Sequence, residues 1–231
     1  TPKTSSAASD VYKRQTLRKG IENSRNLMTI RIAQYLGMEK VAEIANRTGV
    51  MENMPNVLSM ALGAGETSLI DLTAAYASFV NGGKKVEPSL IDRIQDRRGK
   101  NIFLENFAAC TNCDEPYIEE NPMPKLVNSS ESIFDEAKSY QMVSILKGAV
   151  DRGTGRKTKI DGIEIAGKTG TTNNNTDAWF IGFTSDLIIG VYAGFDKPKS
   201  LGKRETGSSV AVPIFRDFVK NYYQEKPILP F

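Results

Sequence analysis

Apolar residues recur at helical spacing in several parts of the chain. Leu27, Ile30 and Ala33 share one helical face. Gly37 follows them as a suitable stop, so we expect a helix over residues 23–36. Similar apolar patterns predict further helices over residues 38–48, 69–80, 132–150 and 212–223.

Strand-like segments concentrate in the second half of the chain. Residues 90–94 and 101–104 flank a turn at Arg98 and Gly99, which predicts a β-hairpin. Further strands are predicted over residues 163–171, 177–183 and 187–195. Residues 107–128 contain three prolines and both cysteines, and we expect an irregular surface excursion there. Helices followed by clustered strands and a last helix indicate an α+β fold, with an antiparallel sheet flanked by helices.

The overall composition is ordinary for a globular protein. The 231 residues are 40% hydrophobic and 25% charged, which suits one domain with a core or two small domains. The net charge of +3 is mild, and no basic run is interleaved with aromatic residues, so a nucleic-acid partner is not indicated. The most apolar run, residues 178–195, is interrupted by Thr184, Ser185 and Asp186, which favours two strands and a turn over a membrane span.

The residue types present narrow the possible chemistry. The chain has no histidine, which excludes Ser-His, Cys-His and His-metal mechanisms and favours Ser/Lys chemistry for any reaction at a serine. Cys110 and Cys113 form a lone C-x-x-C pattern, whereas a zinc site needs about four ligands. We therefore expect no metal site and no cofactor, and interpret the two cysteines as a local disulfide or two loop thiols.

Lys168, Thr169, Gly170 and Thr171 combine features that suit a peptide-binding site. They fall in a predicted strand, whose edge offers N–H and C=O groups to an extended substrate. Gly170 lets another backbone approach closely, and the flanking threonine hydroxyls can hold a substrate carboxylate. Lys168 supplies a cation beside a reacting hydroxyl. The alternative is a threonine-rich turn with a surface lysine, but the strand predicted over residues 177–183 favours the binding site.

The same lysine also belongs to a phosphate-loop pattern. Residues 162–169 satisfy G-x-x-x-x-G-K-[ST]. That loop needs a flexible turn between its glycines and a helix after its lysine. Here residues 163–165 alternate as in a strand, and the Gly, Thr and Asn residues after Thr169 begin a helix poorly. Nucleotide binding is therefore disfavoured.

Ser24, Arg25 and Asn26 form an S-x-N sequence near the start of the first predicted helix. Ser24 could be the N-cap of that helix, which is a purely structural role. In the functional interpretation, Ser24 transfers protons and Asn26 orients the lysine and a substrate amide. Since a K-T-G sequence follows later in the chain, the functional interpretation is favoured.

These two motifs resemble two of the three signatures of the serine acyl-transferases that include penicillin-binding proteins, namely S-x-x-K, S-x-N and K-T-G. Almost all of residues 16–231 resembles the C-terminal part of the transpeptidase domain of class A, bifunctional penicillin-binding proteins. The segments that carry this resemblance are residues 24–26, 61–66, 75–83, 152–155 and 168–172. Only the S-x-x-K motif departs from the pattern. Its two matches begin at Ser144 and Ser200, after Ser24 rather than before it, and we interpret both as chance.

The resemblance implies a β-lactamase/transpeptidase-like fold and a D,D-transpeptidase reaction that cross-links peptidoglycan. An active serine attacks the D-Ala-D-Ala bond of a stem peptide, and the acyl-enzyme then passes to the amine of a neighbouring peptide. The implied partners are stem peptides and the β-lactams that mimic them. The implied location is the periplasmic face of the inner membrane, reached through an N-terminal anchor outside this chain.

The resemblance also assigns roles to individual residues. Ser24, Asn26 and Lys168 would form the proton-relay group. Residues 169–171 would bind the substrate, and the backbone N–H of Thr171 would form half of the oxyanion hole. Without the nucleophile motif, we expect this fragment alone to be inactive.

Two alternatives and one boundary remain open on the sequence alone. The chain could be a degenerate, non-catalytic module that binds peptidoglycan or a partner, or a relative of serine β-lactamases or carboxypeptidases, although no base for deacylation is identifiable. Residues 10–15 resemble the in-frame translation of a sequencing adapter. We therefore interpret residues 1–15 as a non-native, adapter-derived segment and residues 16–231 as a partial transpeptidase domain.

Overall fold

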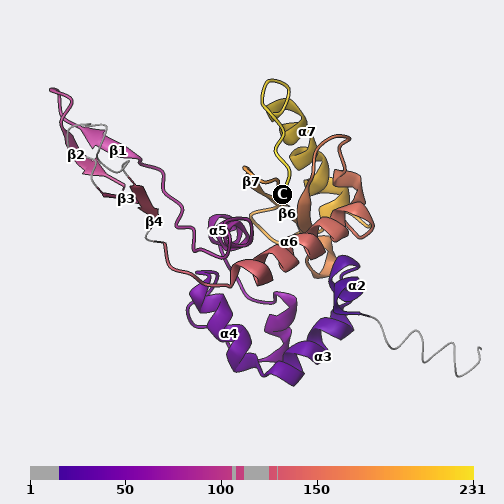
Figure 1. Ribbon diagram of the computed structural model, residues 1–231. Helices are drawn as coiled ribbons and strands as arrows, with labels where there is room; N and C mark the ends of the chain where they lie inside the picture. Colours follow the sequence, from indigo (N-terminus) through magenta and orange to yellow (C-terminus); the bar gives the residue numbers. More distant parts are fainter. Residues whose placement is uncertain (1–15, 106–107, 112–124, 129) are drawn as a thin grey trace, which may run out of the picture.

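The computed structural model describes residues 16–105, 108–111, 125–128 and 130–231 (Figure 1). Its helices are α2 (Leu17–Glu22), α3 (Asn26–Leu36), α4 (Met38–Arg47), α5 (Leu69–Val80), α6 (Glu136–Asp151) and α7 (Val212–Tyr222). Its strands are β1 (Arg93–Gln95), β2 (Asn101–Leu104), β3 (Ala108–Thr111), β4 (Lys125–Asn128), β5 (Ala166–Thr171), β6 (Asp177–Phe183) and β7 (Ile188–Gly194). Shorter helical elements are the 3-10 helices η1 (Leu58–Leu62), η2 (Arg156–Thr158) and η3 (Asn173–Asn175) and the π-helix η4 (Gly207–Ala211).

Strands β5, β6 and β7 form an antiparallel sheet with helices on both faces (Figure 1). Phe180 of β6 lies opposite Val191 of β7, and both pack with Phe215 of α7. Phe183 points to the other face, where it packs with Leu146 of α6. Alternation of side chains along β6 therefore supplies two hydrophobic cores. The expected α+β fold, an antiparallel sheet flanked by helices, is confirmed.

Capping side chains mark the starts of α5 and α6. Ser68 Oγ accepts the N–H of Asp71 at 3.1 Å, and α5 begins at the residue after Ser68, as expected. The helix predicted over residues 132–150 instead begins at Glu136. The reason is that Asp135 Oδ1 accepts two N–H groups of the first turn and so sets the N-terminus.

The prediction of one helix over residues 23–36 is wrong in its first turn. The structure has a separate short helix, α2, that ends at Glu22, and α3 begins only at Asn26. Ser24 lies between them with a φ of 52°, a left-handed conformation that interrupts helical hydrogen bonding. Gly37, with a φ of 89°, ends α3 as expected.

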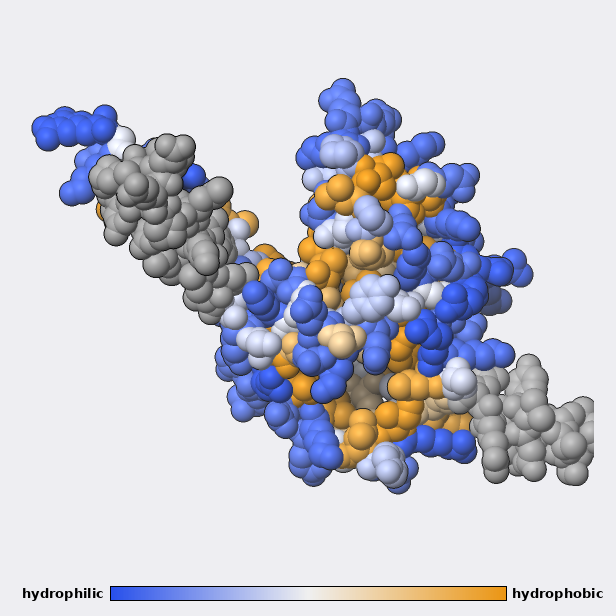
Figure 2. Space-filling view, viewed as in Figure 1, coloured by the Kyte–Doolittle hydropathy of each residue, from blue (hydrophilic) through white to orange (hydrophobic). Residues whose placement is uncertain are grey.

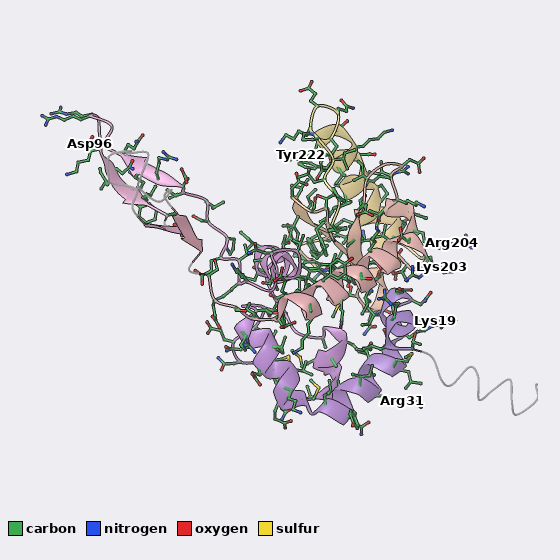
Figure 3. The ribbon with its side chains drawn as sticks, viewed as in Figure 1. Lys19, Arg31, Asp96, Lys203, Arg204 and Tyr222 are labelled. Carbon is green, nitrogen blue, oxygen red and sulfur yellow. The ribbon has the colours of Figure 1, made fainter. Side chains whose placement is uncertain are left out.

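A slender arm, which we define as residues 85–105, 108–111, 125–128 and 130–131, extends away from the other described residues, the body (Figure 1). Strands β1 and β2 form the predicted hairpin in this arm. Asp96 lies at its far end (Figure 3), where its carboxylate accepts the N–H groups of Arg98 and Lys100 at 2.8 and 3.0 Å. A side chain that binds the backbone of its own turn is a typical local signal for a hairpin.

The prediction of irregular backbone over residues 107–128 is wrong for two segments. Strands β3 and β4 pair antiparallel, with Ala108 opposite Asn128. The partner residues are far apart in sequence, and strand formation depends on such pairing more than on local preference. Cys113 lies outside the described residues, so the interpretation of the cysteine pair stays a prediction.

Helices α3 and α4 occupy the lower part of the view (Figure 1), where apolar side chains reach the surface (Figure 2), and the 3-10 helix η1 packs against both. The exposed large apolar residues of these elements include Leu27, Leu36, Ile44, Leu58 and Leu62. Within the described ranges, no helix is both long and apolar enough to cross a membrane.

Candidate active site

Strand β5 carries the K-T-G sequence along one edge of the central sheet. Among the described residues it pairs with β6 alone. Gly170 lies opposite Trp179, and a Cβ at Gly170 would come within 3.1 Å of the Trp179 Cβ. The chain stays extended through Lys168 to Thr171, so residues 162–169 do not form a phosphate loop followed by a helix.

The open edge of β5 presents the backbone groups of alternate residues. The N–H of Thr172 donates to the carbonyl of Asp177 at 3.2 Å, which sets the phase of the antiparallel ladder. The N–H and C=O groups of Thr169 and Thr171 therefore point away from β6. In agreement, the Thr169 carbonyl accepts a hydrogen bond from the Lys168 ammonium at 3.0 Å. This edge can pair with an extended peptide as an additional strand.

Lys168 is the central charged group of the site. Its ammonium donates to the hydroxyl of Ser24, a residue 144 positions earlier in the chain. Burial lowers the pKa of Lys168 to about 8, because desolvation disfavours the charged form of an amine. At neutral pH such an amine is near enough to its pKa to donate and accept a proton in turn.

The turn between α2 and α3 places Ser24 beside this lysine. Ser24 is not a helix cap, because Arg25 is the N-cap of α3 and makes no side-chain capping bond. The N–H of Ser24 donates to the carbonyl of Ile21 at 3.1 Å and so closes α2. A left-handed φ costs a serine on the order of 1–3 kcal/mol, and conformations of this kind cluster at functional sites.

Asn26, the third predicted member of the relay, is the first residue of α3 and is exposed. Within the described part of the chain, its side chain forms no hydrogen bond. The structure therefore brings Ser24 and Lys168 together, but the Asn26 side chain forms no hydrogen bond with either of them. Its role in orienting the lysine and a substrate amide stays a prediction.

The two threonine hydroxyls of β5 are both held by neighbouring segments. Thr169 Oγ1 lies 2.9 Å from Thr154 Oγ1, in the turn that follows α6. Thr171 Oγ1 accepts the N–H of Gly207 at 3.0 Å. The Thr154 N–H in turn donates to the carbonyl of Glu22, at the end of α2, at 3.1 Å. The site is thus assembled from α2, the turn after α6, β5 and η4.

Two of these supporting residues were not predicted as part of the site. Thr154 belongs to residues 152–155, which supported the family resemblance but suggested no contact with β5. Gly207 has no local signal. Its importance is visible only in the packing, since a Cβ there would lie less than 3.0 Å from the carbonyl oxygens of Trp179 and Gly170.

The two S-x-x-K matches later in the chain do not form Ser/Lys pairs in the structure. The ammonium of Lys147 binds the carboxylate of Glu164, and Ser144 Oγ accepts from Arg18 at 3.3 Å. In the second match, Ser200 Oγ accepts a backbone N–H two residues further on. These contacts fit the interpretation of both matches as chance.

Comparison with known proteins identifies the family. The chain matches the family model for the penicillin-binding protein transpeptidase domain over residues 2–220. It is 46% identical over 222 residues to Penicillin-binding protein 1A of Rickettsia conorii, covering 94% of this chain and 28% of that protein. It is 37% identical over 222 residues to Penicillin-binding protein 1A of Neisseria gonorrhoeae, covering 95% of this chain and 26% of that protein. The chain thus spans well under a third of the length of these curated relatives.

Solved structures agree with this result. The crystal structure of Penicillin-Binding Protein 1A from Haemophilus influenzae matches with a TM-score of 0.80 at 29% identity, covering 94% of this chain and 35% of that chain. PonA1 from Mycobacterium tuberculosis, solved in complex with penicillin V, matches with a TM-score of 0.74 at 18% identity, covering 96% and 61%, and shows likeness of fold alone. The motifs that meet at β5 and the match over most of the sequence lead to one conclusion. The chain belongs to the penicillin-binding protein transpeptidase family.

Proposed function

We propose that this chain supplies the S-x-N and K-T-G elements of a serine D,D-transpeptidase that cross-links peptidoglycan stem peptides. The nucleophile would come from a Ser-x-x-Lys motif outside this chain. The serine oxygen attacks the carbonyl carbon of the D-Ala-D-Ala bond, and the terminal D-Ala leaves as an amine. The acyl group then passes from the serine to the amine of a neighbouring stem peptide, which frees the serine.

The contact between Lys168 and Ser24 carries this proposal. A serine hydroxyl bound to an amine with a pKa of about 8 offers a short path for a proton at neutral pH. In this role, Ser24 passes a proton between Lys168 and the leaving or attacking amine. With no histidine in the chain, a lysine with a lowered pKa is the group best suited to that task.

The open edge of β5 supports the assignment of the substrate strand. Thr171 Oγ1 accepts a hydrogen bond from Gly207, so its own hydrogen remains available to a substrate carboxylate. Thr169 would bind the same carboxylate, and Gly170 would leave room for the substrate backbone. The outward N–H of Thr171 would stabilise the oxyanion together with the N–H of the nucleophilic serine.

The proposed chemistry also sets the ligands and the location. Stem peptides that end in D-Ala-D-Ala, and the β-lactams that mimic them, would bind along β5 without a cofactor. Because the cell-wall polymer lies outside the inner membrane, we place the full-length protein at the periplasmic face, with its anchor outside this chain.

Labelling with a fluorescent penicillin tests the proposal in the longer protein that contains this chain. The wild type should form an adduct at the Ser-x-x-Lys serine. Lys168→Ala should slow acylation by about 10²–10⁴-fold, because the proton-transferring group is lost. Lys147→Met, which removes the lysine of the chance S-x-x-K match, is the matched control and should label at the wild-type rate. The 231-residue chain alone should take up no label.

Two results would contradict the proposal. One is an adduct on Ser144, which would make the later S-x-x-K match the nucleophile motif. The other is a native upstream coding sequence without Ser-x-x-Lys, which would favour a degenerate binding module.

A further inference from the structure

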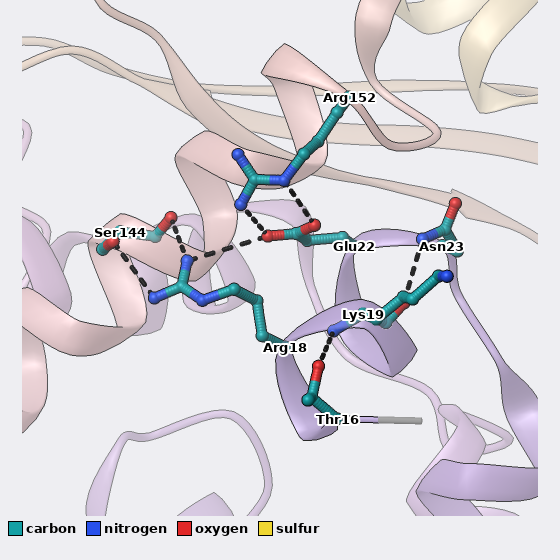
Figure 4. Close-up of polar contacts among 7 residues, drawn as sticks. All are labelled: Thr16, Arg18, Lys19, Glu22, Asn23, Ser144 and Arg152. Carbon is teal, nitrogen blue, oxygen red and sulfur yellow. Dashed lines mark hydrogen bonds and ion pairs between the residues drawn. The ribbon is translucent and has the colours of Figure 1, made fainter. Parts of the chain in front are cut away.

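Glu22, the last residue of α2, has a buried carboxylate two residues before Ser24. Its exposed fraction is 3%. Arg152 binds both carboxylate oxygens, Nε donating to Oε2 at 2.9 Å and Nη2 to Oε1 (Figure 4). Arg18 adds an ion pair at 3.7 Å. A bidentate arginine restrains a carboxylate in both position and orientation, which a single charge does not.

Helix α6 and the turn after it are shaped to admit this residue. A Cβ at Gly148 would lie less than 3.0 Å from Glu22 Oε1. A Cβ at Gly153 would lie less than 3.0 Å from the Glu22 carbonyl oxygen, which accepts the N–H of Thr154 at 3.1 Å. Side chain and backbone of Glu22 therefore occupy a recess that glycines keep open.

The start of α2 is tied to the same helix. Arg18 Nη1 donates to the carbonyl of Ser144 at 3.0 Å, and Nη2 donates to its hydroxyl at 3.3 Å (Figure 4). Helix α2 has six residues, too few to hold its position by its own hydrogen bonds. The contacts at its two ends with α6 and the following turn therefore determine where the Ser24 turn lies.

The contacts close a ring around the candidate active site. Glu22 binds Thr154 through its backbone, and Thr154 contacts Thr169 on β5 at 2.9 Å. Lys168, next to Thr169, binds Ser24. Ser24 lies two residues after Glu22 in the chain, so the backbone closes the ring. A shift of Glu22 relative to the turn after α6 would move Ser24 relative to Lys168.

We propose that Glu22 and Arg152 are positioning residues for acylation, which hold the turn between α2 and α3 so that Ser24 stays in contact with Lys168. Neither side chain hydrogen-bonds to the Ser24 hydroxyl or the Lys168 ammonium, so both would act through the backbone. The inference rests on the proposed transpeptidase function. Displacements of about 1 Å at a reacting group can cost on the order of 100-fold in rate, which sets the scale of the expected effect.

Stopped-flow acylation by a fluorescent penicillin in the longer protein separates the rate constant of the chemical step from the affinity of the initial complex. Glu22→Gln keeps the shape but loses the charge, and should lower the rate constant about 10- to 100-fold with little change in initial affinity. Arg152→Lys keeps the positive charge but loses the bidentate guanidinium, and should lower the rate constant by less than Glu22→Gln does. Glu164→Gln breaks a different ion pair, the one with Lys147 of α6, and is the control that should keep the wild-type rate constant.

The rate constant is read from the time course of labelling, to which only folded molecules contribute. Partial unfolding therefore lowers the amplitude of labelling and leaves the rate constant unchanged. A reduced amplitude with unchanged rate constants in Glu22→Gln and Arg152→Lys would reveal a merely structural role and overturn the inference. Wild-type protein that takes up no label would overturn the proposed function itself. Labelled wild type with two slowed variants and an unaffected Glu164→Gln would establish the positioning role.

Discussion

The candidate site and the arm are both built on short β-strands, yet their side chains are anchored differently. In the sheet, Phe180 is fully buried, whereas Phe103 in the arm is 43% exposed. At the site, Lys168 binds Ser24 from a distant part of the sequence. In the arm, Asp96 binds the backbone of its own turn. Long-range packing therefore determines the geometry of the site, and local turn chemistry determines that of the β1–β2 hairpin in the arm.

This difference matters because the two kinds of anchoring respond differently to change. A contact between distant segments depends on every element that carries them, so one displaced helix moves several groups at once. A hairpin turn keeps its shape as long as its own few residues allow it. The body should therefore be sensitive to substitution over a wide region, and the β1–β2 hairpin only at its turn.

The largest contrast is expected for two phenylalanines. Phe180→Ala should lower the free energy of unfolding by about 3–5 kcal/mol, because Phe180 packs against Phe215 and its loss leaves a cavity. Phe103→Ala, on the exposed hairpin, should cost about 1 kcal/mol or less. Urea denaturation of the two variants measures both losses, and equal losses would contradict the comparison.

A smaller contrast is expected for two glycines. Gly207→Ala forces a Cβ against the carbonyl oxygens of Trp179 and Gly170, which cannot move without disturbing β5 and β6, so we expect a loss of about 1–3 kcal/mol. A Cβ at Gly99 in the arm would meet no atom within 4 Å, but the φ of 79° makes alanine strained there, at about 1 kcal/mol.

The rate of acylation by penicillin should distinguish the two glycine variants more clearly than their stability does. Gly207→Ala should also slow acylation, because Gly207 binds the hydroxyl of Thr171. Gly99→Ala should leave the rate unchanged. A slowed Gly99→Ala would show that the arm is coupled to the site.

Much of the fold was predictable because its signals are local. The helix over residues 69–80 was predicted correctly from its apolar pattern. The strand over residues 177–183 was also predicted with its observed bounds. The break at Ser24 was missed, because a left-handed serine has no distinct signature in an otherwise helical segment.

The site was predictable only as far as its motifs extend. Lys168 and Ser24 were chosen from short motifs, and the structure places them in contact. Glu22 and Gly207 were not foreseen, since their roles arise from segments that meet only in the folded chain. Asn26 was also chosen from a motif, but its side chain forms no hydrogen bond with Lys168 in the structure.

The smallest expected effect is a pH dependence that belongs to the body alone. Burial lowers the pKa of Lys168 from its ordinary 10.5 to about 8, so between these values the unfolded chain binds more protons than the folded one. Stability should therefore rise with pH through this window, and the cost of burying the charge is fully present below pH 8. Partial exposure reduces the full value of about 3 kcal/mol to about 1–2 kcal/mol.

The control for this effect is Lys168→Met, which removes the titrating group. Burial raises the pKa of Tyr76 and Tyr223 to about 12, and these groups lower stability as pH rises above 10, opposing the lysine. The difference between wild type and Lys168→Met cancels the tyrosine contribution, so thermal unfolding of both proteins from pH 7 to 10 isolates the lysine. A difference that does not change with pH would mean that Lys168 is solvated like an ordinary surface lysine, and its proposed role in proton transfer would lose its physical basis.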